Sequence, residues 1–208
     1  MDKPATVFVV DDDVSVREGL DSLLRSVGYA VSVFASVREF ALVRRPDTPS
    51  CLVLDVRMPG PSGMDFQAEL SALNDPIPIV FLTGHGDVPM AVRAIKLGAV
   101  EFLLKPFREQ DLLDAVRVAI GKDEARRKDE AALAELKERF ATLTMREKEV
   151  LAFVAQGRLN KQIAADLGLS EVTVKVHRGQ VMRKMGAATL AELVRLADLI
   201  AGQERAIR

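Results

Sequence analysis

The sequence predicts an α/β domain with a doubly wound parallel sheet, followed by a helical linker and an all-α domain. The chain has 208 residues, enough for one large domain or two small ones. Short apolar runs alternate with helical patterns in the first part, whereas only helical spacing follows. The charge also changes sign: residues 1–122 hold 13 Lys and Arg against 17 Asp and Glu, and residues 123–208 hold 16 against 13. We therefore expect domain limits at 1–120, 121–142 and 143–208.

Five short apolar segments of the first domain are predicted strands. They are Thr6–Val10, Ala30–Phe34, Cys51–Leu54, Ile77–Leu82 and Val100–Leu104, and helical patterns lie near 14–27, 36–44, 64–73, 88–97 and 108–120. Nearly continuous apolar strands suit burial on both faces, as in a parallel sheet that helices cover on each side. Five such strands commonly adopt the flavodoxin-like order 2-1-3-4-5.

Residues 121–142 are charged and rich in Ala, and Leu133, Leu136 and Phe140 keep helical spacing. This pattern predicts a helical linker, either a solvated helix or a short coiled-coil seam. The last domain is predicted to hold four helices, near Met145–Gln156, Lys161–Leu167, 171–185 and 189–200. Thr144 and Glu147 have the spacing of a capping box, and Ser170 is placed to cap the third of these helices.

Cysteine and histidine usage excludes several kinds of site. Cys51 is the single cysteine, and the two histidines lie far apart. A disulfide framework and metal sites built on Cys are therefore excluded, and two such distant histidines leave little for a metal site built on His. No apolar run approaches the roughly 18–20 residues of a membrane span, and no signal peptide is visible. We expect a protein of the cytoplasm with no membrane partner.

Carboxylates gather at the predicted ends of two neighbouring strands. Asp11, Asp12 and Asp13 follow the first strand, and Asp55 ends the third. Ligand sites of open α/β sheets lie at the carboxyl ends of strands, where the strand order reverses. Two carboxylates about 4 Å apart repel by about 4 kcal/mol at an effective dielectric constant near 20, so the cluster needs a cation. Oxygen ligands favour a hard divalent ion, and Mg²⁺ is the expected cofactor.

Thr83 and Lys105 follow the fourth and fifth strands and add a hydroxyl and a positive charge at the same edge. Together with the carboxylates, they form a site that could accept a phosphoryl group on one Asp and stabilise its oxygens. For Asp13, the alternative is a helix N-cap, because a helical pattern begins at the next residue.

Four motifs of this domain resemble the receiver domain of two-component response regulators: Val-Val-Asp-Asp-Asp at 9–13, Leu-Asp-Val-Arg-Met-Pro-Gly at 54–60, Phe-Leu-Thr-Gly at 81–84 and Phe-Leu-Leu-Lys-Pro-Phe at 102–107. The resemblance implies a role for each matching residue. Asp55 would be the phospho-acceptor, Asp11 and Asp12 the acidic pocket, Thr83 and Phe102 the switch pair, and Lys105 the phosphate-binding cation. Asp12, Asp55 and the backbone carbonyl of Arg57 would bind Mg²⁺.

Positive charge is concentrated in residues 157–186, which hold six Lys and Arg against two Asp and Glu. A short helix, a turn with Gly168 and a longer basic helix favour a helix-turn-helix, whose later helix enters the major groove of DNA. We expect its buried face to carry Val172, Val181 and Met185, together with either Val176 or Val174. This leaves Lys175, Arg178 and Lys184 on the DNA side; the alternative is a basic but merely solvated helix.

The segments Leu-Thr-Met-Arg-Glu-Lys-Glu-Val-Leu at 143–151, Asn-Lys-Gln-Ile-Ala at 160–164 and Ser-Glu-Val-Thr-Val-Lys-Val-His-Arg at 170–178 resemble the LuxR-type DNA-binding domain. With a receiver in front, the whole chain is similar to response regulators of the FixJ/NarL type. The resemblance implies that Lys175 and Val176 face bases, and that Lys161, Thr173 and Arg178 hold the DNA backbone.

The resulting hypothesis is a transcriptional regulator that is not an enzyme. A histidine kinase would phosphorylate Asp55, and the protein would then form a homodimer, bind promoter DNA and act as an activator with RNA polymerase. One alternative is a phosphatase of the haloacid-dehalogenase kind, in which Asp11 and Asp13 form the Asp-x-Asp motif. The other is a constitutive DNA-binding or scaffold protein with a vestigial receiver.

Overall fold

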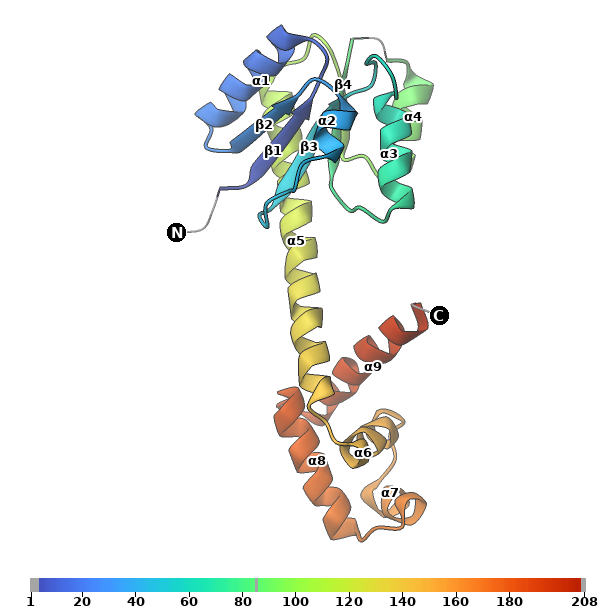
Figure 1. The fold of residues 1–208 in the computed structure, drawn as a ribbon. Helices are drawn as coiled ribbons and strands as arrows, with labels where there is room; N and C mark the ends of the chain where they lie inside the picture. Colours follow the sequence, from blue (N-terminus) through green and yellow to red (C-terminus); the bar gives the residue numbers. More distant parts are fainter. Residues whose placement is uncertain (1–3, 85, 207–208) are drawn as a thin grey trace. The chain divides into compact units, whose positions relative to one another are not determined.

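The structure, a computed structural model, describes residues 4–84 and 86–206 (Figure 1). The chain divides into two compact units between Lys128 and Asp129. This division lies within one continuous helix, α5 (Glu109–Ala141). The segment 121–142 is thus helical almost throughout, while the functional domain limits stay a prediction.

The first unit contains, in its described part, one sheet of five parallel strands. The strands are β1 (Thr6–Val10), β2 (Ala30–Phe34), β3 (Ser50–Asp55), β4 (Ile79–Thr83) and β5 (Glu101–Leu104). Their order is β2-β1-β3-β4-β5, which confirms the predicted fold class and strand order. In the register, Val7 lies between Val31 of β2 and Cys51 of β3.

Helices cover both faces of the sheet (Figure 1). They are α1 (Val14–Ser26), α2 (Val37–Ala41), α3 (Gly63–Ala72), α4 (Val88–Lys96) and the first turns of α5. Side chains alternate along a strand, so β1 serves two cores. Val7 and Val9 pack in one core with residues of α1 and α5, and Phe8 and Val10 pack in the other with residues of α2 and α3.

Two element limits differ from the sequence prediction for identifiable reasons. The fourth strand begins at Ile79 rather than Ile77, because Pro78 has no N–H with which to continue a ladder. The helix expected to end at residue 120 runs on to Ala141. Residues 122–141 are mostly Ala, Glu, Lys, Arg and Leu, which are good helix formers.

The second unit packs α6 (Met145–Ala155), α7 (Asn160–Leu167), α8 (Glu171–Met185) and α9 (Leu190–Ala206) with the last turns of α5. Its core includes Val150, Ile163, Val174 and Leu193. The predicted caps are present: Thr144 and Glu147 form a capping box, and Ser170 accepts a hydrogen bond from the Thr173 N–H. Gly168 ends α7 in the left-handed conformation that glycine favours, with φ 64°.

The predicted buried face of α8 is wrong at Val172. Val174, Val181 and Met185 are buried, but Val172 is 73% exposed and Val176 is 56% exposed. Two residues along a helix correspond to about 200° of rotation, so the neighbours of Val174 at this spacing point away from the core. The outward face of α8 therefore carries two valines.

Asp123 anchors α5 to the amino-terminal end of β3. Its side chain is 1% exposed and accepts hydrogen bonds from Arg126, Arg127 and the Ser50 N–H. Arg127 also pairs with Asp47, in the loop before β3. Burial alone would raise the pKa of the Asp123 carboxyl, but the hydrogen bonds from Arg127, Arg126 and Ser50 outweigh it and lower that pKa.

Among the helices of the described residues, none combines the length and the apolar character that crossing a membrane requires.

Candidate functional site

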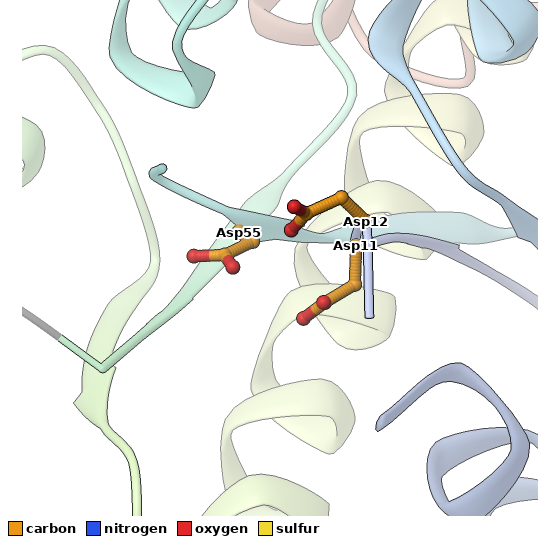
Figure 2. Close-up of side chains that lie close together, drawn as sticks. All are labelled: Asp11, Asp12 and Asp55. Carbon is orange, nitrogen blue, oxygen red and sulfur yellow. The ribbon is translucent and has the colours of Figure 1, made fainter. Parts of the chain in front are cut away.

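Three carboxylates converge at the carboxyl ends of β1 and β3 (Figure 2). Asp11 and Asp12 directly follow β1, and Asp55 is the last residue of β3. Each of the three offers a ligand oxygen, and these atoms all lie within 4.8 Å of one another. Asp11 and Asp55 are buried, whereas Asp12 is exposed. The convergence follows from parallel pairing, because neighbouring parallel strands end at the same edge.

Lys105 reaches this cluster from the end of β5. Its Nζ donates to Asp11 Oδ2 at 2.5 Å and to Asp55 Oδ2 at 3.3 Å. Burial raises the pKa of Asp11, and hydrogen bonds from Lys105 and the Asp13 N–H only partly oppose it. Burial would lower the pKa of Lys105, but its hydrogen bond to Asp11 and the charges of Asp11 and Asp55 raise it. Lys105 is therefore held as a cation.

Backbone groups orient two of the carboxylates. Asp11 Oδ1 accepts from the Asp13 N–H at 3.0 Å, and Asp55 Oδ1 accepts from the Arg57 N–H at 3.3 Å. The side chain of Asp13 instead accepts from the N–H groups of Ser15 and Val16 at the start of α1. The N-cap interpretation of Asp13 is thus confirmed, and this carboxylate is engaged away from the cluster.

The two predicted switch residues lie on neighbouring strands. Thr83 ends β4 and is fully buried, and the strand register places Leu82, just before it, opposite Asp55. Phe102 of β5 is half-buried and packs on Phe81, with 6.0 Å between ring centroids. The peptide bond between Lys105 and Pro106 is cis.

The site suits a divalent cation by charge and by ligand type. Three carboxylates and the ammonium of Lys105 leave two negative charges, and the available ligand atoms are oxygens. Hard cations such as Mg²⁺ favour carboxylate oxygens and keep several waters, which a partly exposed cluster permits. Asp11, Asp12 and Asp55 therefore form a candidate site for a divalent metal.

Gly63, the first residue of α3, is required by its close approach to Asp55. A Cβ at this position would lie 2.2 Å from the backbone carbonyl oxygen of Asp55. The Gly63 N–H donates to the carbonyl of Val56 at 3.0 Å, which holds the two segments together. Sequence reasoning did not single out Gly63, because only the folded chain brings α3 against the end of β3.

We expect Gly63→Ala to lower the free energy of unfolding of the first unit by about 1–3 kcal/mol, because the added methyl overpacks a rigid backbone contact. Urea unfolding followed by tyrosine fluorescence measures this, since Tyr29 is the single Tyr, the chain has no Trp, and Tyr29 packs in this unit. Gly121→Ala is the control: it is helical and a Cβ there meets nothing within 4 Å. Equal stability of the two variants would contradict the steric argument.

The residues predicted to contact DNA lie on α7 and α8. Lys161, Lys175 and Val176 are exposed. Thr173 is half-buried, and its hydroxyl lies 2.8 Å from that of Ser170. Arg178 donates to Asn160 Oδ1 at the start of α7, so it joins the two helices of the helix-turn-helix. The DNA contacts of these residues stay a prediction.

Lys184 has a partner inside the second unit. Its Nζ donates to Glu147 Oε2 at 2.6 Å and to the carbonyl oxygen of Thr142 at 3.1 Å. The hydrogen bond from Lys184, with that from the Thr144 N–H, lowers the pKa of the Glu147 carboxyl. The ammonium thus reinforces the capping box at the start of α6, a role that the sequence analysis did not foresee.

We expect Lys184→Met to destabilise the start of α6 by about 1 kcal/mol, because the mostly buried Glu147 loses a charged hydrogen-bond donor that is itself partly exposed. Hydrogen exchange should then speed up at the amides of residues 147–150. Arg183→Met is the matched control, since Arg183 is exposed on the same helix and donates to the side chain of Gln180, three residues before it. Unchanged exchange in Lys184→Met would show that the pair contributes little.

Comparisons with known families match both units. The family described as "Response regulator receiver domain" matches residues 7–117, and the family described as "Bacterial regulatory proteins, luxR family" matches residues 141–197. The first match contains the acidic cluster and Lys105, and the second contains α6, α7 and α8.

Curated relatives match along nearly the whole chain. Nodulation protein W of Bradyrhizobium diazoefficiens is 56% identical over 196 residues, covering 94% of this chain and 86% of the relative. Transcriptional regulatory protein FixJ of Azorhizobium caulinodans is 46% identical over 202 residues, covering 97% and 95%. Among solved structures, response regulator StyR is similar with a TM-score of 0.83 and 52% identity, covering 94% of this chain and 99% of that one.

Proposed function

Because the chain belongs to the two-component response regulators that join a receiver domain to a LuxR-type DNA-binding domain, we propose that phosphorylation of Asp55 controls its binding to promoter DNA. The protein is a transcription regulator and not an enzyme, so the phosphatase alternative is set aside. The observation that carries the proposal is the convergence of Asp55 with Asp11, Asp12 and Lys105 at one edge of the sheet.

In the proposed transfer, a carboxylate oxygen of Asp55 attacks the phosphorus of a phosphohistidine on a partner kinase. The P–O bond forms as the P–N bond breaks, and the leaving imidazole takes a proton from solvent. Lys105, 3.3 Å from Asp55, is placed to pair with the phosphoryl oxygens. Asp12, Asp55 and the Arg57 carbonyl would hold Mg²⁺, which when bound neutralises charge on the phosphoryl oxygens.

The signal would leave the site through Thr83 and Phe102. The phosphoryl group would draw the Thr83 hydroxyl toward it, and Phe102 would pack further inward. Close packing would transmit such a shift, since a Cβ at Gly86 would lie 2.8 Å from the Phe102 ring. The face formed by α4 and β5 exposes Val92, Ile95 and Leu104, and we propose that it forms the homodimer contact.

Dimerisation would pair two helix-turn-helix units on one promoter. A single small unit binds weakly, whereas two units on half-sites about one helical turn apart combine their affinities. Lys175 and Val176 would face bases, and Lys161, Thr173 and Arg178 would hold the duplex, whereas Lys184 is held by Glu147. We propose that the bound dimer activates transcription with RNA polymerase, and that the protein works in the cytoplasm.

The test measures oligomeric state and DNA binding side by side, with and without a small acyl phosphate and Mg²⁺. We expect the treated protein to become dimeric and to protect two half-sites in a footprint on a duplex selected from random sequence. Omitting Mg²⁺ should suppress both changes. Equal DNA affinity and equal oligomeric state with and without the phosphodonor would overturn the proposal and favour a vestigial receiver.

A further inference from the structure

The outward face of α8 is a single exposed stripe. Val172, Lys175, Val176, Gly179 and Arg183 are all exposed. At about 100° per residue, these five positions fall within about 100° of arc, with Val172 near the middle. This face is opposite the buried Val174, Val181 and Met185. Val172 is therefore as central to the groove-facing surface as the residues predicted to read bases.

Apart from Lys175, this stripe is apolar and narrow over its first two turns. Val172 and Val176 are four residues apart, so their side chains are neighbours on the helix surface. Gly179, one turn further, has no side chain, and a Cβ there would meet nothing within 4 Å. A helix with no side chain at that point can lie closer to the floor of a groove.

Cations flank the two valines on the same surface. Lys175 lies at one edge of the arc, Arg183 lies in line with the valines seven residues beyond Val176, and Lys161 is exposed at the start of α7. Lys161 and Arg183 can neutralise phosphates and fix the orientation of the helix, but phosphate contacts carry no sequence information by themselves. In the major groove, thymine is distinguished by an apolar group, the 5-methyl group, which apolar side chains contact. The flanking cations and the two valines thus fit one ligand, a DNA half-site that presents thymine methyl groups.

We propose that Val172, together with Val176, contacts thymine 5-methyl groups in the major groove and makes the half-site preference depend on them. This inference rests on the proposed function, because it requires that α8 enters the groove. It adds Val172 as a specificity-determining residue and names the chemical group that it contacts.

The experiment replaces thymidine by deoxyuridine, which lacks only the methyl group. The full-length protein, treated with a small acyl phosphate and Mg²⁺, first selects duplexes from a random pool. Each thymidine of the selected half-site is then replaced singly. Burying one methyl-sized group changes affinity about fourfold. We therefore expect the wild type to bind about fourfold more weakly when deoxyuridine replaces a contacted thymidine.

Single-residue variants show which side chain contacts which thymidine of the half-site. Val172→Ala should bind the thymidine and deoxyuridine duplexes equally at one position, and Val176→Ala should do so at another. Val172→Ile keeps the branched apolar surface and should keep the preference. Val118→Ala is the matched control, since Val118 is 53% exposed on α5, and it should leave the thymidine-to-deoxyuridine ratio unchanged. Alanine is also the better helix former, so Val172→Ala does not weaken α8.

Two results would overturn the inference: a selected half-site insensitive to deoxyuridine at every position, or a Val172→Ala variant that keeps the wild-type ratio at all of them. A protein that selects no duplex would instead overturn the proposed function, and the inference with it. Slopes of log affinity against log salt concentration separate the roles further. Val172→Ala should leave the slope unchanged, whereas Lys161→Ala, at a position proposed to hold the DNA backbone, should reduce it.

Discussion

The Asp55→Asn variant is expected to take up no phosphoryl group from a small acyl phosphate, whereas the wild type takes up one. The amide of Asn is not a nucleophile for phosphorus, and no other carboxylate of the cluster replaces it. Asp11 is bound by Lys105 and by the Asp13 N–H, and Asp12 lies exposed at the rim. Intact-protein mass spectrometry measures the added phosphoryl group, and borohydride reduction marks the modified residue as homoserine.

Asp13→Asn is the matched control for this experiment. It removes a carboxylate two residues from Asp11, but Asn caps helices as well as Asp does, so α1 should stay intact. We expect this variant to be phosphorylated as the wild type is. Homoserine at a position other than 55, or full labelling of Asp55→Asn, would contradict the assignment of the phospho-acceptor.

The order of the strands along the chain predicted the carboxylate cluster well, because the position of the cluster depends on the topology of the sheet. Once five strands alternate with helices, the residues after the first and third strands must meet, and Asp11, Asp12 and Asp55 do so. Lys105 follows from the same reasoning on the last strand. What the order could not predict is which partner each group takes, such as the Asp13 side chain capping α1 rather than joining the cluster.

The sequence predicted less well which face of α8 is buried. Valines occur at 172, 174 and 176, and two-residue spacing does not settle which of them a helix buries. The placement of Val174 with Val181, seven residues later, gives the right phase, because seven residues nearly complete two turns. Val172 then points outward, and the error at this one residue hid the apolar part of the stripe.

Contacts between residues far apart in sequence were not predictable. Lys184 lies 37 residues from Glu147, and Asp123 lies 73 residues from Ser50. In the sequence, each looks like one more charge in a basic helix or a charged linker. In the folded chain, burial distinguishes Asp123 from its neighbours: its side chain is 1% exposed, whereas that of Asp114 on the same helix is 53% exposed.

Asp123→Ala is expected to lower the free energy of unfolding of the first unit by about 2–3 kcal/mol. Removing one partner of a buried ion pair typically costs about 3–5 kcal/mol, and the lower figure applies because Arg126 and Arg127 are partly exposed and can be hydrated. The variant also leaves the Ser50 N–H without its acceptor. Urea unfolding followed by Tyr29 fluorescence reports on this unit.

The control is Asp114→Ala, since Asp114 pairs with Arg117 three residues later on the same helix, as Asp123 does with Arg126. Both partners of that pair are exposed, so removing Asp114 should change stability by less than about 0.5 kcal/mol. If both variants lost the same stability, burial would not be the cause.

The pH dependence gives an independent check with a defined sign. Hydrogen bonds in the folded state lower the pKa of Asp123 below its ordinary value of 3.8. The unfolded chain therefore takes up a proton first as the pH falls, and the stabilisation is complete above about pH 5 and disappears as the pH falls through the folded pKa. The stability difference between the wild type and Asp123→Asn should accordingly stay constant from about pH 8 to pH 5 and shrink toward pH 3. A difference that grew on acidification would mean that the folded state holds this carboxyl protonated, and the ionic account of the anchor would then be wrong.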